Sequence, residues 1–253
     1  MNKIKYSLLV IFLLLISYSY SQTNDSSSTS QTNTGNTVEP ASEFRPFRIG
    51  VYGDLGASWM VPKNDYYIKN GSKISAGWGL LFDWNFTENY TFSSGFYLGN
   101  FGGKLKYNHK LPDANNVIGL MERKYNIKYL DIPLNLKLKT NQIGYFTYFF
   151  QIGINNGFRL SATADDIFTS TTDPKESYAK DKIDIIGSTS LYRLSFNVGA
   201  GAEYQISKSF SAFAYLGYNN GLLNSLSGQN SVDPNVKENA IINKLSLTAG
   251  FLF

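Results

Sequence analysis

Apolar and polar residues alternate with period two along most of this chain, from Phe47 to Phe253. In the clearest stretch, 74–86, the even positions read Ile, Ala, Trp, Leu, Phe, Trp, Phe and the odd positions read Ser, Gly, Gly, Leu, Asp, Asn. Such alternation places one side of a pleated strand in an apolar medium and the other side in a polar one. The pattern predicts eight strands at about 47–57, 74–86, 90–99, 125–139, 146–159, 192–204, 210–218 and 245–253.

The segment 125–139 changes parity partway along its length. Tyr125, Ile127 and Tyr129 share one face, and the apolar positions then run from Leu130 to Leu138 on the other parity. A parity switch inside a strand is what a β-bulge produces, and a proline in the segment removes one ladder donor. We therefore expect a bulge within this strand.

The connections between the predicted strands are short and long in turn. Three of them, 87–89, 141–143 and 207–209, read as tight turns, whereas the polar stretches at about 59–72, 107–123, 162–188 and 221–240 read as long loops. Strict alternation of this kind is typical of an outer-membrane barrel with short periplasmic turns and longer outer loops. The prediction is an all-β, eight-stranded antiparallel up-and-down transmembrane barrel with both termini periplasmic. A soluble β-sandwich is the alternative, in which the apolar faces would cover each other.

The N-terminal region has the features of a signal peptide followed by a linker. Lys3 and Lys5 precede an apolar core of about ten residues and a small-residue end, which predicts a signal peptide over residues 1–21. Residues 22–46 are rich in Ser, Thr, Asn and Gln, too poor in apolar surface to offset ordering entropy, so we expect a disordered tether. The barrel domain would then occupy residues 47–253.

Composition narrows the functional classes. The chain has no cysteine, which excludes disulfides, thiolate metal sites and cysteine nucleophiles, and it has a single histidine. Without residues 1–21 the chain carries 21 basic and 19 acidic side chains, and no basic stripe stands out, so we expect no nucleic-acid partner.

The charged residues on the inward parity are the main candidates for a site. An eight-stranded barrel leaves room inside for side chains but for no wide pore, and buried charges are normally paired. We expect an internal ion-pair network that plugs the lumen, with an anion or ligand site near Arg159 and Arg193 as the alternative. The pairing stays open between Asp131–Arg193 with Lys137–Glu203 and other matchings. The network residues are Asp54, Asp83, Asp131, Lys137, Arg159, Arg193 and Glu203.

Catalytic and metal sites have little support in the sequence. His109 falls in the second predicted loop, where a lone histidine is usually a solvated side chain. The acidic loop from Asp165 to Asp184 does not match the spacing of a calcium-binding loop, and a solvated mixed-charge loop is the simpler interpretation. We therefore expect no catalytic residues, no metal and no cofactor.

Two stretches resemble a known family. The strand from Tyr129 to Lys139, which opens Tyr-Leu-Asp-Ile-Pro-Leu, and the segment 48–56 are similar to those of the PorT-like outer-membrane β-barrel family. The resemblance implies a non-enzymatic barrel in the outer membrane of a Gram-negative bacterium, and one branch of the family serves type IX secretion and gliding. The ending with Phe251 and Phe253 is similar to the signal that the barrel-assembly machinery recognises, which implies that machinery and periplasmic chaperones as partners.

The sequence thus favours a non-enzymatic barrel with a plugged interior and a structural or interaction role in the outer-membrane bilayer. One alternative is an accessory component of a type IX secretion or gliding complex, with a protein partner there. Another is a narrow pore or small-ligand carrier.

Overall fold

The computed structural model describes residues 44–111, 117–171 and 174–253. The predicted signal peptide, 1–21, and the predicted tether up to residue 43 lie outside the described residues. In the part of the chain that is described, no helix has both the length and the hydropathy needed to cross a membrane.

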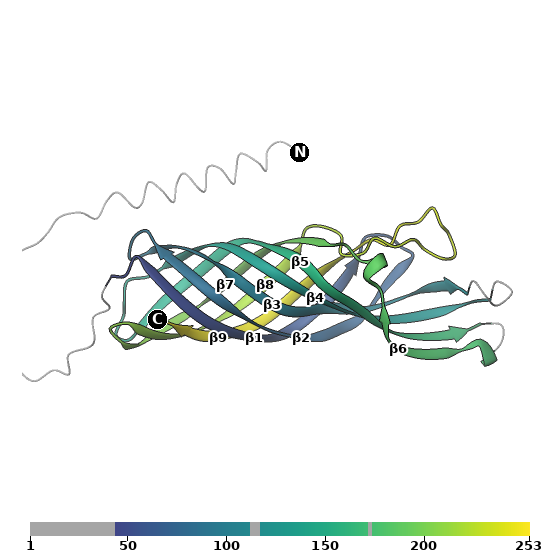
Figure 1. Cartoon of the computed structure of the whole chain (residues 1–253), viewed down its shortest axis with the longest axis horizontal. Coiled ribbons are helices and arrows are strands. Elements are labelled where there is room, and N and C mark those ends of the chain that lie inside the picture. Colours follow the sequence, from purple (N-terminus) through teal and green to yellow (C-terminus); the bar gives the residue numbers. More distant parts are fainter. Residues whose placement is uncertain (1–43, 112–116, 172–173) are drawn as a thin grey trace, which may run out of the picture. The chain divides into compact units, whose positions relative to one another are not determined.

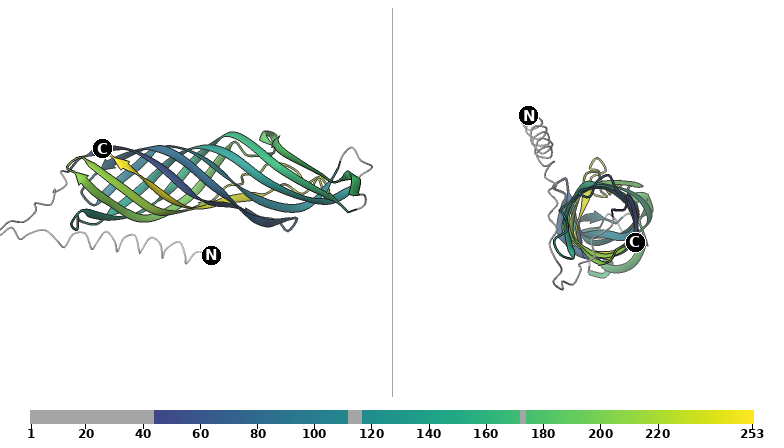
Figure 2. Two further views of the ribbon diagram at one scale, coloured as in Figure 1. Left: turned by 90° about the horizontal axis from the view of Figure 1, so that it is seen from below. Right: turned by 90° about the vertical axis from the view of Figure 1, so that its left-hand side faces the viewer.

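The described residues form one antiparallel sheet of nine strands, eight of which close into a barrel. Going round the barrel the order is β1, β2, β3, β4, β5, β7, β8 and β9, while β6 pairs with β5 alone. The end-on view in Figure 2 shows the closed ring. This confirms the prediction of an eight-stranded antiparallel barrel. The strands are β1 (Phe47–Pro62), β2 (Tyr67–Asn85), β3 (Tyr90–Lys110), β4 (Ile118–Lys139), β5 (Phe146–Ser170), β6 (Tyr178–Asp184), β7 (Tyr192–Ser207), β8 (Phe210–Gly221) and β9 (Ala240–Leu252).

The barrel closes where its first and last strands meet. β1 and β9 pair antiparallel from Gly50 opposite Leu252 to Pro62 opposite Ala240. Beyond this ladder, Ile49 N–H donates to the Phe253 carbonyl at 3.3 Å and Phe253 N–H donates to the Ile49 carbonyl at 2.8 Å. Closure leaves no free edge in the barrel, which is what a sheet needs in a medium without water.

The connections at the two ends of the barrel differ, and one part of the prediction is wrong. The three tight turns lie where the sequence placed them, at what we call the lower end. At the opposite, upper end, three of the four expected long loops are largely strand: β1 and β2 reach Pro62 and Tyr67, and β3, β4 and β5 extend still further (Figure 1). Among the described residues of the upper end, the connection 222–239 between β8 and β9 is the longest irregular stretch.

The extended hairpins are held by a second core, which the sequence analysis overlooked. Most of their inward side chains are buried and apolar, among them Met60, Leu105, Met121, Tyr125 and Phe168. Here the alternation is reversed, with apolar residues inside and polar residues outside, as in a soluble barrel. Because of this reversal, the upper parts of the strands have no outward apolar face, and the sequence pattern did not identify them as strands.

The expectation of a bulge within the strand 125–139 is also wrong. Every odd-numbered residue of β4 from Tyr125 to Lys137 is buried and faces the interior. What changes along β4 is the environment of its two faces. Above Leu130 the inward face meets an apolar core and the outward face meets water. Below Leu130 the inward face meets polar side chains and the outward face is apolar. The extra residue is on the neighbouring strand, since the β4–β5 register steps from Lys128–Ser161 to Tyr129–Arg159.

The outer wall carries an exposed apolar band. Trp78 is 60% exposed and Leu247 is 59% exposed, although both are large apolar side chains. On β4 the band runs over eight residue steps from Leu138 to Leu130, and steps of about 3.3 Å tilted by about 40° give a height of about 20 Å. Such a band matches the apolar girdle of a transmembrane barrel, about 25 Å tall.

The upper end is covered by two further segments. β6 adds to the upper part of β5, beyond the point where β7 begins. The connection 222–239 folds back on the mouth, where Leu226 is buried and bridges Thr189. The described residues also include the short 3-10 helices η2 (Pro174–Glu176) and η3 (Ile186–Ser188).

Candidate functional site: the barrel interior

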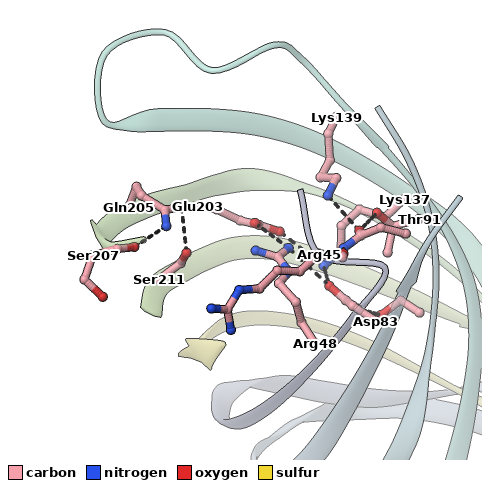
Figure 3. A network of polar contacts seen from close by, with 12 residues as sticks. Arg45, Arg48, Asp83, Thr91, Lys137, Lys139, Glu203, Gln205, Ser207 and Ser211 are labelled. Carbon is pink, nitrogen blue, oxygen red and sulfur yellow. Dashed lines mark hydrogen bonds and ion pairs between the residues drawn. The ribbon is translucent and has the colours of Figure 1, made fainter. Parts of the chain in front are cut away.

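A four-residue ion-pair cluster lies inside the lower part of the barrel (Figure 3). Lys137 Nζ lies 2.7 Å from Asp83 Oδ2 and 3.5 Å from Glu203 Oε1. Arg48 Nη2 lies 2.7 Å from Glu203 Oε2 and 3.7 Å from Asp83 Oδ2. Ser93 Oγ donates to Asp83 at 2.6 Å. Two cations and two carboxylates therefore balance, and their bonds link β1, β2, β4 and β7 across the lumen.

A second ion pair occupies the middle of the barrel. Lys244 on β9 pairs with Asp54 on β1, and Tyr97 on β3 donates to Asp54 Oδ1 at 2.6 Å. Lys244 was missed in the sequence analysis, because the last predicted strand began one residue too late. Its parity matches the inward Ser246 and Thr248, and this pattern could have identified it.

The third ion pair is fully buried and joins Arg193 on β7 to Asp131 on β4. Arg193 is 0% exposed, and its Nη2 lies 2.9 Å from Asp131 Oδ2. Its guanidinium lies 4.0 Å from the ring centre of Phe101 and 5.3 Å from that of Tyr129. Arg193 Nε and Nη1 and Asp131 Oδ1 have no hydrogen-bond partner among the described residues. The aromatic faces thus stabilise part of a charge that one carboxylate oxygen does not fully satisfy.

Arg159 lies outside this network, contrary to the expectation. Its Nη1 donates to the Ile186 carbonyl at 2.7 Å, to Thr189 Oγ1 at 2.7 Å and to the Thr189 carbonyl. Arg159 lies opposite the inward Tyr129, next to the register step at Leu160, and its guanidinium reaches the segment between β6 and β7. It therefore secures the segment after β6 and is not available to pair with Asp131.

A small cavity of about 60 Å³, lined by both polar and apolar side chains, lies between the charged layers. Asn197 Nδ2 donates to Asn135 Oδ1 at 2.7 Å and to Asn155 Oδ1 at 2.8 Å, and Asn155 Nδ2 donates to Asn219 Oδ1 at 2.5 Å. A cavity of this size and polarity has room for a few water molecules. It is too small for a metabolite.

His109 lies on β3 and is half-buried, rather than solvated in a loop. Its Nδ1 is 2.7 Å from Ser231 Oγ, which also accepts from the Lys110 N–H at 2.9 Å. A serine beside a histidine is part of a hydrolytic arrangement, but such a site also needs a group that orients the histidine. Asp166, an acid whose charge acts on His109, already receives both hydrogen bonds of the Arg123 fork, at 2.6 Å each. The contact therefore serves to hold the β8–β9 connection against β3.

No metal site is present in the described residues. They contain no group of three or more His, Asp or Glu side chains placed to hold a metal ion. Asp165, one of the acids considered for calcium, lies on β5 and pairs with Lys124 at 3.1 Å.

The two aromatic residues of the expected assembly signal lie on the outer wall near the lower end. Phe251 and Phe253 are 46% and 54% exposed. Both pack on Phe210 of β8, with ring centres 5.4 Å and 5.1 Å apart. Their exposed rings are therefore accessible from the side of the barrel.

Comparisons with known protein families and solved structures identify the family to which this chain is similar. A family model described as outer membrane protein beta-barrel domain matches residues 20–227. Among solved structures, Neisserial surface protein A covers 82% of this chain and 96% of its own, with 10% identity and a TM-score of 0.41. OprG from Pseudomonas aeruginosa covers 85% and 96%, with 13% identity and a TM-score of 0.40.

The outer membrane protease OmpT from Escherichia coli covers 83% of this chain and 98% of its own, with 10% identity and a TM-score of 0.35. No curated protein sequence matches the chain. The family model, which spans most of the chain, is therefore the finding that bears on identity.

Proposed function

Because this chain belongs to the outer membrane protein beta-barrel domain family, we propose that it acts as a non-catalytic scaffold in the outer membrane and presents its extended hairpins to partners. The observation that carries this proposal is the filled interior. The lumen is crossed by the Arg48–Glu203–Lys137–Asp83 cluster and by the Arg193–Asp131 pair, and above them lies an apolar core. In such a barrel the inward side chains make the barrel rigid, and the surface that recognises partners lies outside the membrane.

The filled lumen predicts that the barrel does not conduct ions. Purified full-length protein in planar lipid bilayers should give no reproducible conductance, because paired side chains from opposite walls fill the cross-section. Steady channels that change on Arg193→Ala would instead support the narrow-pore alternative and would contradict the scaffold proposal. Asn141→Ala, at an exposed lower turn, is the matched control.

The proposal includes an orientation in which the lower end and both termini are periplasmic and the extended hairpins lie outside the cell. It is supported by the general rule that outer-membrane barrels have short turns on the periplasmic side. Since the chain has no cysteine, single substitutions report topology without background. Asn108→Cys, exposed at the upper end, should react with a membrane-impermeant maleimide on intact cells, whereas Asn141→Cys should react only after lysis. The reverse result would overturn the orientation.

A second candidate is an accessory role in a secretion or gliding complex, as for the PorT-like branch. It is favoured by the Tyr-Leu-Asp-Ile-Pro-Leu motif, residues 129–134. In the structure, however, Tyr129 packs in the upper core and Asp131 pairs with Arg193, so these motif residues have a structural role of their own. Extraction in mild detergent distinguishes the candidates: a stoichiometric periplasmic or membrane partner that co-purifies with the barrel would favour the accessory role.

A further inference from the structure

A group of lysines lies on the outer wall of the barrel, on three neighbouring strands at the upper edge of the apolar band. We call it the lysine belt. Lys104 and Lys106 lie on β3, opposite the segment of β4 that carries the next two, and Lys73 of β2 reaches across to donate to Asn126 Oδ1. The belt consists of Lys73, Lys104, Lys106, Lys124 and Lys128.

The belt begins directly where the apolar band ends. On β4, Leu130 is the uppermost residue of the apolar band and Lys128 is the next outward position. On β2, Ile74 is 75% exposed and Lys73 adjoins it. Lys128 and Lys73 lie at the height of the lipid headgroups, and Lys104, Lys106 and Lys124 lie further up the same wall.

Positive charge is in excess within the belt. Two carboxylates accompany the five lysines: Glu122 lies 3.1 Å from Lys106, and Asp165 lies 3.1 Å from Lys124. Lys104 lies directly opposite Lys124 in the β3–β4 register, an arrangement of like charges that destabilises a sheet unless an anion joins them. Lys128 has Asn100 and Ser161 as its cross-strand neighbours, neither of which is acidic.

The belt is confined to one sector of the wall. β1, β7, β8 and β9 lie wholly within the described residues, and their lysines and arginines are Arg48, Arg193 and Lys244, all of which point into the lumen. A general need for solubility would distribute cations around the whole rim. A one-sided cluster instead indicates a discrete binding surface.

We propose that the lysine belt binds the phosphate groups of lipid headgroups in the outer leaflet. Ammonium groups on flexible stems at headgroup height bind phosphate as point charges, and the apolar wall below them packs the acyl chains of the same lipid. A free phosphate would gain only the first of these contacts. The assignment to the outer leaflet rests on the orientation proposed above, whereas phosphate binding itself does not.

The test uses the full-length barrel in detergent micelles and native mass spectrometry with bisphosphorylated lipid A as the probe. The test variant is Lys104→Gln/Lys124→Gln/Lys128→Gln. The control variant, Lys63→Gln/Lys180→Gln/Lys237→Gln, removes the same charge from upper-end positions away from the band. We expect wild type and control to retain the lipid equally, and the test variant to bind it at least tenfold more weakly.

Two further arms identify the ligand. Dephosphorylated lipid A should bind wild type as weakly as the bisphosphorylated lipid binds the test variant, and millimolar inorganic phosphate should not displace the bound lipid. The proposal would be overturned if the wild type and the test variant bound the lipid equally, or if the wild type bound the two lipids equally. Displacement of the lipid by free phosphate would also overturn it. Heat-modifiable migration on gels shows that each variant is folded. Because micelles have no leaflets, failure here is distinct from failure of the orientation, which the maleimide labelling reports.

Discussion

Arg193 and Asp131 form the interior contact on which single substitutions should act most strongly. Asp131→Ala leaves a fully buried guanidinium with aromatic faces as its remaining support. Removing one partner of a buried pair costs about 3–5 kcal/mol. We expect a loss of this size in the free energy of unfolding, measured by urea titration in lipid vesicles.

The double variant Asp131→Leu/Arg193→Met provides the control. Replacing a buried pair by apolar residues of similar volume is often neutral or stabilising. It should therefore be more stable than Asp131→Ala. A double variant as unstable as the single one would show that shape rather than charge pairing governs this layer.

Because Glu238 is buried, we expect the stability of the folded barrel to depend on pH. It lies in the β8–β9 connection, is 7% exposed, and accepts a 3.4 Å hydrogen bond from Tyr67. Burial raises the pKa of the Glu238 carboxyl, an effect that the nearby Arg123 opposes. Since the folded pKa is raised, the stabilising contribution is complete below the ordinary glutamate pKa and is lost as pH rises through the folded value.

Glu238→Gln should therefore be more stable than wild type at pH 8 and equal to it near pH 4. Thermal unfolding of the upper end, followed by protease resistance at both pH values, measures the difference. An advantage of the Gln variant that is unchanged at pH 4 would contradict this account.

At the scale of the strand, facing direction should decide the effect of a substitution. Val198 lies on the outward face of β7 within the apolar band, so Val198→Arg places a charge in lipid and should cost about 2–4 kcal/mol. Its neighbour Asn197 points inward and donates two hydrogen bonds. Asn197→Ala should cost about 1–2 kcal/mol. Equal costs in vesicle unfolding would contradict the assigned facing.

The same scale explains which elements could be predicted from the sequence. Below the upper edge of the apolar band, lipid outside and polar side chains inside impose strict alternation, and the strands and turns there were located correctly. Above it, water outside and the core around Tyr125 and Phe168 inside reverse the polarity, so strands read as polar loops. The apparent bulge in β4 was the same change of medium, seen along one strand whose side chains never change direction.

At the scale of the whole molecule, closure at the β1–β9 seam should control assembly. Phe253 forms the last backbone hydrogen bonds of that seam, with Ile49, and packs on Phe210. We expect deletion of Phe253 to lower the amount of heat-modifiable barrel in the outer-membrane fraction. Deletion of one residue from the 22–43 segment is the control and should leave that amount unchanged. Normal membrane levels without Phe253 would contradict an assembly role.

The sequence by itself determined the class of medium and the strand number, because a side chain's facing in a strand follows from its parity alone. Parity also brought Asp54, Asp83, Asp131, Lys137, Arg193 and Glu203 to the inner wall. Only the tertiary structure decided their partners, since contacts across a lumen join strands distant in sequence. It gave Arg159 partners in the segment after β6, added Lys244 to the interior, and brought lysines from three strands together above the apolar band, because register and local bulges depend on the whole closed sheet.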